Sequence, residues 1–150
     1  MSIKVISYNR KASYEYFLEE KFEAGLVLVG TEIKSIRQGK VNFKDAYVSI
    51  INDEAFIKEM HISSYDHGNR YNHDETRERK LLLNKREIRK LKQKIQQQGY
   101  TIIPTKLYLK NGRAKLEIAL AKGKKLYDKR NTEKLKDAKR EIDRAMKYRY

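Results

Sequence analysis

The sequence predicts a mainly β protein with helices: a small closed antiparallel β-barrel with peripheral helices and a basic C-terminal tail. Three observations predict this class. Some short segments alternate apolar and polar residues, and others are apolar runs that end at turn signals; both patterns are typical of strands in antiparallel sheets. Two tight-turn pairs, Asn52-Asp53 and Asn111-Gly112, each separate two such runs. Residues 122–150 lack this pattern and carry twelve basic and five acidic residues, a net charge of +7.

The N-terminal part is predicted to contain one helix and two strands. Asn9 is a candidate N-cap for a short helix over residues 10–15, because its amide oxygen can accept an early N–H group. Period-two alternation predicts a strand over residues 16–23. The apolar run 26–29 indicates a return strand after a turn at Ala24-Gly25.

The middle of the chain is predicted to hold a helix, a hairpin and a long loop. Thr31 is a candidate cap for a short helix that ends at Gly39. Strands are expected over residues 46–51 and 55–60. The polar residues 61–78 indicate a surface loop, and a loop of that length in a compact domain is commonly functional or mobile.

A third helix and a second hairpin complete the expected domain. Asn84 is a candidate N-cap for a helix that runs to about residue 98, with Gly99 after its end. Strands are expected over residues 100–109 and 114–121. Six short strands with helices between them favour a closed barrel of the oligonucleotide-binding type, because closure removes exposed sheet edges. A two-layer open sheet with helices on one face is the alternative.

The charge balance indicates a polyanionic partner. The 150 residues include 35 Lys and Arg against 20 Asp and Glu, a formal net charge of +15. Such an excess is self-repulsive in a free compact protein and attracts nucleic acid. Cysteine is absent, which excludes disulfides, zinc–thiolate sites and cysteine nucleophiles. No apolar run approaches the ~20 residues that span a bilayer, so a cytoplasmic protein without a membrane partner is expected.

Three basic segments are candidates for contact with phosphates. One covers residues 77–94, with nine basic and two acidic residues. The others are Asn9-Arg10-Lys11 and the segment from Lys122-Gly123-Lys124-Lys125 to Asp128-Lys129-Arg130. Ammonium and guanidinium groups neutralise phosphates and release counterions. Eleven tyrosines add rings that can stack on unpaired RNA bases.

Neither a catalytic site nor a metal site is expected. Glu19 and Glu20 are neighbours on a predicted strand, so their carboxylates point to opposite faces. His61, His67 and His73 are spaced by six residues, which matches no zinc-ligand pattern and favours surface-loop histidines. A binding protein without a cofactor is therefore expected, rather than an enzyme.

Several segments occur together in a specific order along the chain: residues 9–12, 16–26, 30–37, 79–84, 121–125 and 128–130. With these motifs the chain resembles the small protein B family, also called the SsrA-binding or tmRNA-binding proteins. The resemblance implies an oligonucleotide-binding-like barrel with peripheral helices. It also implies binding to the tRNA-like part of transfer-messenger RNA (tmRNA) and delivery of that RNA to stalled bacterial ribosomes for trans-translation, with the protein in place of the missing anticodon stem.

The resemblance also implies roles for particular residues. It places Asn9, Glu23 and Leu83 on or beside the RNA-binding surface. With the neighbouring motif residues, the expected RNA-binding set is Asn9, Arg10, Lys11, Glu23, Arg79, Lys80, Leu83 and Asn84. The expected ribosome-binding set is Lys122, Gly123, Lys124, Lys125, Tyr127, Asp128, Lys129 and Arg130. Tyr127 stands where the family usually has a histidine, a replacement that is compatible with ring stacking but not with a role that needs an imidazole.

Residues 122–150 are expected to form a tail separate from the barrel domain of residues 1–121. A helix there carries only a thin apolar stripe, formed by Leu135, Ala138, Ile142 and Ala145. Such a tail is expected to be disordered when free and to fold against a partner, and permanent packing on the barrel is the alternative. The resemblance implies that it becomes helical in the decoding site and the empty mRNA channel of the small ribosomal subunit.

The implied partners are tmRNA and the ribosome, with elongation factor Tu and alanyl-tRNA synthetase reached through the shared RNA, and the protein is expected to be a monomer in this complex.

Two other classes stay open from composition alone. A structural ribosomal protein with a basic extension predicts constant stoichiometry on every ribosome. An RNA-processing enzyme predicts metal-dependent RNA cleavage by the purified protein.

Overall fold

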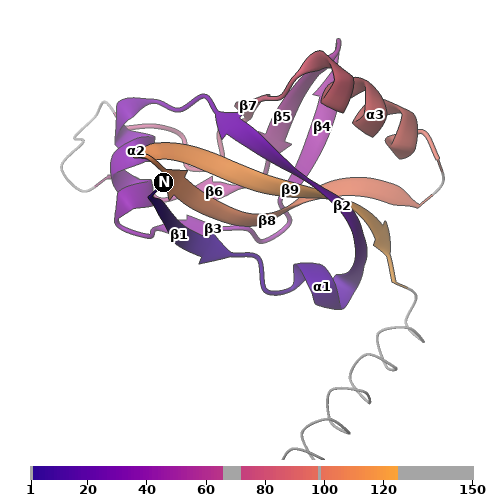
Figure 1. The fold of residues 1–150 in the computed structure, drawn as a ribbon. Coiled ribbons are helices and arrows are strands. Elements are labelled where there is room, and N and C mark those ends of the chain that lie inside the picture. The colour runs from indigo at the N-terminus through magenta and orange to yellow at the C-terminus, as the bar shows by residue number, and fades with distance from the viewer. Residues whose placement is uncertain (1, 66–71, 98, 125–150) are drawn as a thin grey trace, which may run out of the picture.

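Seven antiparallel strands form the main sheet of the protein (Figure 1). The structure is a computed structural model that describes residues 2–65, 72–97 and 99–124. In spatial order the strands are β1 (Ile3–Tyr8), β8 (Tyr100–Lys110), β9 (Arg113–Gly123), β2 (Tyr16–Leu26), β7 (Arg79–Leu82), β5 (Glu54–Lys58) and β4 (Tyr47–Ile51). A separate ladder pairs β3 (Val41–Asn42) with β6 (His61–Ile62). The helices of the described residues are α1 (Ala12–Glu15), α2 (Gly30–Arg37) and α3 (Lys85–Ile95).

Both predicted hairpin turns are confirmed. Asn52 and Asp53 join β4 to β5 with φ angles of 51° and 60°. Asn111 and Gly112 join β8 to β9 with φ angles of 52° and 80°. Positive φ at both central residues gives the turn whose twist matches the flanking strands, and Asn, Asp and Gly adopt it most readily. The local sequence is therefore sufficient to specify these two turns.

The sheet is open, so the predicted closed barrel is not confirmed. Within the described residues, β1 and β4 are the two end strands and are not paired with each other. The sheet nevertheless curls around the core, because β4 comes close to β8 (Figure 1). The prediction of a mainly β, antiparallel fold with few helices is confirmed. Turn signals report pairing between neighbours in sequence, whereas closure depends on two strands that are far apart in the chain.

The predicted turn at Ala24-Gly25 is wrong, because β2 continues through both residues. Gly25 pairs with Leu82 of β7, and a Cβ atom at Gly25 would lie 3.2 Å from the Cβ atom of Leu82. A glycine inside a strand marks a close approach of a neighbouring chain as well as a turn. The return strand expected over residues 26–29 is consequently absent, and this segment leads into α2.

The start of α2 differs from the prediction and its end agrees with it. Val29 is the N-cap residue in place of Thr31, and its backbone N–H donates to Oε1 of Glu32 at 2.9 Å. At the other end Gly39 has a φ of 75°, and its N–H donates to the carbonyl of Ile36 at 2.9 Å. This left-handed residue closes the helix as a glycine after a C-terminus commonly does.

Strands β1, β3, β6 and β7 have no counterpart among the six expected strands, and β6 lies inside the predicted loop of residues 61–78. β1 pairs with β8 along the edge of the sheet. β7 begins directly after the predicted loop and bridges β2 to β5. Burial departs from polarity at both ends of β7, because the charged Arg79 is buried and the apolar Leu82 is exposed, whereas Lys80 is exposed and Leu81 buried as expected. Hydrophobic periodicity therefore gives no signal for β7.

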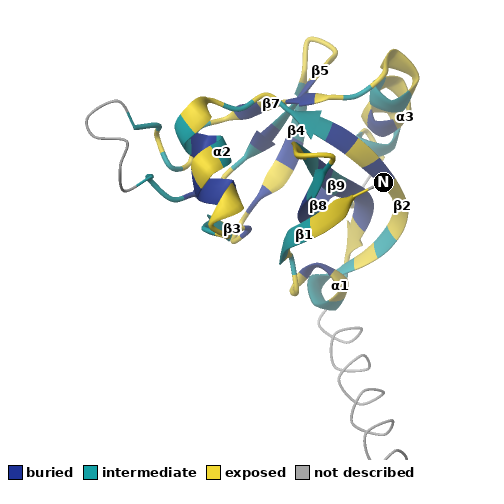
Figure 2. Cartoon of the chain, turned by 60° about the vertical axis from the view of Figure 1, so that its left-hand side comes forward, coloured by how far each residue is buried: buried dark blue, intermediate teal, exposed yellow. Residues whose placement is uncertain are grey.

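The core lies inside the curved sheet, between α2 and α3, which sit at opposite ends of it (Figures 1 and 2). Ile36 of α2 and Leu91 of α3 are fully buried with apolar side chains of the sheet such as Ile57 and Ile118. Ile95 of α3 also packs against this core, and most of the charged residues of the helix are exposed. The helix ends at Ile95, and residue 98 lies outside the described residues.

Asn84 caps α3 as predicted, and its removal is expected to destabilise the fold modestly. Its Oδ1 accepts from the backbone N–H of Glu87 at 2.8 Å, and Oε1 of Glu87 accepts from the N–H of Asn84 at 3.1 Å. The variant Asn84→Ala is expected to lose about 1 kcal/mol of unfolding free energy. Asn84→Asp is expected to lose much less, because its carboxylate also accepts the capping hydrogen bond. Urea titration measures both; equal losses in the two variants would contradict a capping role.

A buried ion cluster fastens α2 to β7. Glu32 and Arg79 are both fully buried, and the Nε atom of Arg79 donates to the Glu32 carboxylate. Arg77 donates to the other carboxylate oxygen at 2.6 Å, and Arg79 also donates to the carbonyl of Met60 at 2.5 Å. A buried charge is tolerated only when it is paired and hydrogen-bonded, and this cluster meets both conditions.

Candidate nucleic-acid interface

A row of polar side chains crosses four neighbouring strands on the solvent side of the sheet. Tyr8 of β1 is opposite Lys106 of β8, Lys106 is opposite Glu117 of β9, and Glu117 is opposite Glu23 of β2. Residues directly opposite each other in a sheet point to the same face. We name this surface the outer face and define it by Tyr8, Glu23, Lys106, Tyr108, Lys110, Lys115 and Glu117.

Glu23 is the acceptor around which the outer face is ordered. Its Oε2 accepts from the hydroxyl of Tyr108 at 2.6 Å and from Nζ of Lys110 at 3.5 Å. The Tyr108 hydrogen bond, aided by Lys110 and Lys115, holds the pKa of Glu23 below its usual value. Burial and donation to Glu23 raise the pKa of Tyr108. At neutral pH the face therefore presents an ionised carboxylate, a protonated phenol and the surrounding ammonium groups.

Lys106, Lys110 and Lys115 of the outer face were not among the predicted binding residues. Lys106 lies over the ring of Tyr108, with Nζ 5.5 Å from the ring centroid. The alternation of Lys106, Tyr108 and Lys110 along one strand was the available signal, since residues two apart on a strand share a face. Ammonium groups beside aromatic rings are the components that bind phosphates and stack with bases.

Asn9 lies at the end of β1, beside the outer face, and anchors the following loop. Its backbone N–H donates to the carbonyl of Thr105 at 2.7 Å, and its Nδ2 donates to the carbonyl of Pro104 at 2.8 Å. The predicted capping role is wrong, because α1 starts at Ala12 with Lys11 in the N-cap position and no side-chain cap. Asn9 is thus a positioning residue for the loop that carries Arg10 and Lys11.

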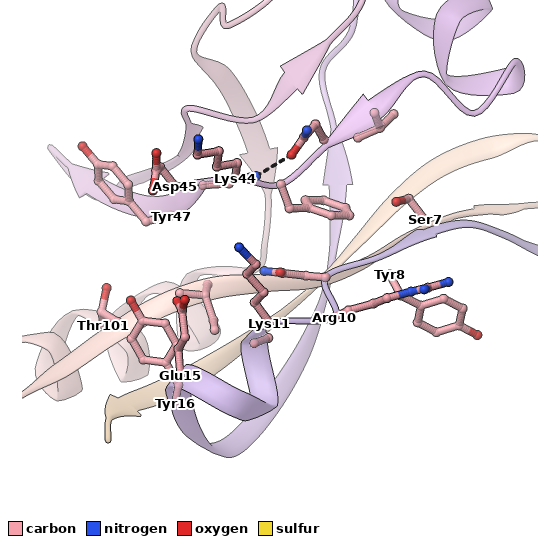
Figure 3. A pocket seen from close by; sticks show the side chains of 17 residues that line it. Ser7, Tyr8, Arg10, Lys11, Glu15, Tyr16, Lys44, Asp45, Tyr47 and Thr101 are labelled. Carbon is pink, nitrogen blue, oxygen red and sulfur yellow. Dashed lines mark hydrogen bonds between the residues drawn. The ribbon is translucent and has the colours of Figure 1, made fainter. Parts of the chain in front are cut away.

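Arg10 and Lys11 line a groove of about 720 Å³ (Figure 3). One wall is formed by residues 7–16 and the other by residues 41–47, with two β8 residues between them. The second wall was not among the predicted sites, since nothing in the sequence indicates that these two segments meet.

The motif at residues 79–84 is mainly structural in the described fold. Arg79 is fully buried in the ion cluster, so the prediction that it contacts RNA is corrected. Lys80 is exposed and lies 3.3 Å from Glu54, Leu83 packs against the core, and Asn84 caps α3. Leu83 directly follows Leu82, which pairs with Gly25, two residues from Glu23. β2 thereby connects this motif to the outer face.

The root of the tail is held by α1 and its neighbours. β9 runs past the expected boundary to Gly123, which pairs with Tyr16. The backbone N–H of Lys124 donates to the carbonyl of Glu15 at 3.0 Å, and its Nζ donates to the carbonyl of Ser13 at 2.9 Å. Lys122, by contrast, is exposed and lies over the ring of Tyr100 at 5.6 Å.

Five residues of the predicted ribosome-binding set lie outside the described residues: Lys125, Tyr127, Asp128, Lys129 and Arg130. The predicted tail helix lies outside them as well.

The histidines of the long loop have structural partners. His61 lies 2.7 Å from Glu75, and His73 joins the hydroxyl of Thr31 to the carbonyl of Ile62. His67 lies outside the described residues. The described part of the chain contains no cluster of three metal-ligating side chains. None of its helices has the length and apolar character needed to cross a membrane.

A strongly basic chain whose antiparallel sheet presents lysines and an exposed tyrosine on an ordered outer face has the character of an RNA-binding protein. A family model described as "SmpB protein" matches residues 6–148. The chain belongs to the SmpB protein family.

Similar proteins agree with this assignment over nearly the whole chain. The SsrA-binding protein of Shouchella clausii is 60% identical over 146 residues, which cover 97% of this chain and 94% of that protein. The SsrA-binding protein of Desulfitobacterium hafniense is 61% identical over 142 residues, covering 95% and 91%. A solved structure described as "tmRNA-SmpB: a journey to the center of the bacterial ribosome" contains a chain with a TM-score of 0.69 and 41% identity, covering 80% of this chain and 85% of that one.

Proposed function

We propose that this protein binds the tRNA-like domain of tmRNA and delivers that RNA to stalled ribosomes for trans-translation. The observation that carries the proposal is the 60% identity, across 97% of the chain, to a protein named for SsrA binding. The similar solved structure, whose description joins tmRNA, SmpB and the ribosome, supports the second half of the proposal.

The outer face is the surface that we assign to tmRNA. Lysine ammonium groups there attract the phosphate backbone, and the exposed ring of Tyr8 offers a flat surface to an unpaired base. Tyr108 is buried beneath Lys106 and holds Glu23 in place. Glu23 orients Tyr108 and Lys110 rather than repelling the RNA, because its charge is already engaged by both. A fixed arrangement of donors suits a folded RNA, which is recognised by shape and backbone more than by sequence.

Residues 125–150 are the part that we assign to the ribosome. They carry ten basic and five acidic residues, so phosphate-lined walls attract them. In this proposal the tail enters the decoding site and the empty mRNA channel and becomes helical there. A channel that already holds mRNA excludes the tail. The protein therefore recognises a stalled ribosome by binding in its empty mRNA channel, without any catalytic group. The ordering of the backbone opposes this step by about 1–2 kcal/mol per residue, and the phosphate contacts must offset it.

The remaining partners follow from the RNA. Elongation factor Tu and alanyl-tRNA synthetase are proposed to meet this protein only through the shared tmRNA. The protein acts as a monomeric, non-enzymatic adaptor in the cytoplasm, in a complex built from a small basic domain, one folded RNA and the small-subunit channel.

A matched pair of lysine variants tests the assignment of the outer face. Lys110 and Lys58 have side chains that are 29% and 30% exposed, and each lies near one glutamate, but only Lys110 is on the outer face. The variant Lys110→Ala is expected to weaken tmRNA binding and to lower the slope of log K against log salt by about one. Lys58→Ala is expected to leave the slope unchanged. Filter binding at several salt concentrations measures both slopes. Equal slopes in the two variants would refute the assignment of tmRNA binding to the outer face.

A further inference from the structure

Strand β8 contains a β-bulge that decides which of its side chains reach the outer face. Its pairing with β9 shifts between Pro104 and Lys106, so Thr105 is an extra residue in β8. Ile102 before the bulge and Leu107 after it are both fully buried in the core. In a regular strand, residues an odd number of positions apart point to opposite faces. The extra residue therefore turns Lys106 toward the outer face rather than into the core.

The bulge is held from both neighbouring strands. Directly after β1, Asn9 donates its backbone N–H to the carbonyl of Thr105 at 2.7 Å and its Nδ2 to the carbonyl of Pro104 at 2.8 Å. On the β9 side, the hydroxyl of Thr105 lies 3.2 Å from the carbonyl oxygen of Glu117 and donates to Oε2 of the same residue. A bulge disrupts the regular ladder, and these hydrogen bonds give its polar groups new partners.

The carboxylate of Glu117 is held by Thr105 rather than by Lys106. Its Oε1 is 4.0 Å from Nζ of Lys106, which is too far for a hydrogen bond, while its Oε2 accepts from the hydroxyl of the buried Thr105. Nζ of Lys106 lies instead over the ring of Tyr108, 5.5 Å from the ring centroid. The side chain of Lys106 is 33% exposed, so its ammonium group is accessible to a phosphate.

The position of the Glu117 carboxylate affects how the outer face meets an RNA. Glu117 lies directly opposite Glu23, which is already engaged by two donors. The donor to Glu117 is a neutral hydroxyl, which fixes the carboxylate without neutralising its charge. Without that hydroxyl the carboxylate is expected to move to Lys106, because a hydrogen bond between two charged groups is the stronger one. A lysine paired in this way contributes less to phosphate binding.

We propose that Thr105 is a positioning residue for tmRNA binding, because its hydroxyl holds the Glu117 carboxylate away from Lys106 and leaves that ammonium group to a phosphate of the RNA. The inference rests on the proposed function, since it takes the outer face to be the tmRNA surface. Thr105 is buried and acts through Lys106 rather than on the RNA itself. It acts twice: as the extra residue that turns Lys106 outward and as the donor that occupies the competing carboxylate.

Substitutions at Thr105 in the full chain separate the hydroxyl from the shape of the side chain. Thr105→Val keeps the shape and is expected to lower the slope of log K against log salt for tmRNA by about one, because Lys106 then pairs with Glu117. The affinity is expected to fall about 1.5- to fivefold, the range for one exposed ion pair. Thr105→Ser keeps the hydroxyl and is expected to restore both values. Thr31→Val is the matched control, because it also removes a hydroxyl that is hydrogen-bonded, to His73 at 2.9 Å, outside the outer face.

A double variant distinguishes this positioning role from a purely structural one. In the Glu117→Gln background no carboxylate competes for Lys106, so adding Thr105→Val is expected to leave the salt slope of that background unchanged. A role in bulge stability alone predicts the same loss in both backgrounds. Lys106→Ala gives the reference value: it is expected to lower the slope by about one, and Thr105→Val added to it is expected to lower the slope no further. Thermal melts establish which variants are folded.

The outcomes of these binding measurements separate the alternatives. A slope that falls in Thr105→Val and does not fall when Glu117→Gln is present supports the inference. An unchanged slope in Thr105→Val, or an equal fall in both backgrounds, overturns it. An unchanged slope in Lys106→Ala overturns it as well, even where Thr105→Val does not fold. A failure of the unchanged protein to bind tmRNA would instead overturn the proposed function, so the two failures are distinguishable.

Discussion

A chain that ends at Lys124 is expected to bind tmRNA with nearly the affinity of the full protein and to support no tagging of stalled polypeptides. All residues of the outer face lie before this point, so the tmRNA surface is kept. The removed segment carries ten basic and five acidic residues and is the part proposed to enter the ribosome. Electrophoretic mobility shift with tmRNA and a tagging assay in a reconstituted translation system measure the two outcomes.

The cut belongs after Lys124 rather than after Ala121 because of the way that β9 ends. Gly123 pairs with Tyr16, and Lys124 is hydrogen-bonded to α1, so an earlier cut removes part of the sheet as well as the tail. A chain with residues 125–150 in scrambled order keeps their charge and is the matched control. It is expected to support no tagging either, and normal tagging by either chain would refute the two-part division.

The variant Arg79→Met is expected to lose about 3–5 kcal/mol of unfolding free energy, the usual effect of removing one partner of a buried pair. Glu32 would remain buried with Arg77 as its only cationic partner, and the carbonyl of Met60 would lose its donor. Urea denaturation measures the loss, provided that the unfolding free energy of both proteins falls with urea concentration at the same slope. The neighbouring substitution Lys80→Met is the control and is expected to change stability by less than about 1 kcal/mol, since that residue is exposed.

A double variant separates the loss of a partner from the loss of packing. In the chain with Glu32→Met and Arg79→Met no buried charge is left, and Arg77 is exposed enough to reach water. Its stability is expected to exceed that of Arg79→Met alone, because replacing a whole buried pair by apolar groups is commonly close to neutral. Purely additive losses from the two single variants would contradict this account of the cluster.

The same cluster predicts a loss of stability in acid. Burial alone would raise the pKa of Glu32, but hydrogen bonds from Arg77, Val29 and Arg79 outweigh it, and the pKa lies below its usual value. A carboxyl group of this kind stabilises the fold above its unfolded-state pKa and loses that contribution as the pH falls through the folded-state pKa. The unfolding free energy is therefore expected to fall in that acidic range, and Glu32→Gln is expected to remove part of this pH dependence.

The elements that the sequence predicts correctly are specified within a few residues. The turn at Asn111-Gly112 needs only its own φ angles, and the cap at Asn84 needs only the helix that follows it. Gly25 shows the opposite case. A glycine between apolar residues suits a turn equally well, and only the distant strand β7 explains why a side chain is excluded there.

The residues of the candidate site also divide into those that the local sequence predicts and those that depend on distant segments. The basic segment at Arg10 and Lys11 was visible from composition, and both side chains are exposed beside the groove. Arg79 belonged to an equally basic segment but is buried, because charge counts do not reveal a partner 47 residues away at Glu32. The outer face and the second wall of the groove form only when strands distant in sequence pair, so no local pattern predicts them.

The attachment of Lys124 to α1 fixes the last described residue of the chain against the globular domain. An angular error at a fixed origin grows in proportion to the length of the arm beyond it. A helix of 26 residues is about 39 Å long, at about 1.5 Å per residue, so a tilt of roughly 10° at its start displaces its far end by about 7 Å. In the proposed ribosome-bound state, the two hydrogen bonds of Lys124 are therefore expected to decide whether the end of the tail helix reaches the channel entrance.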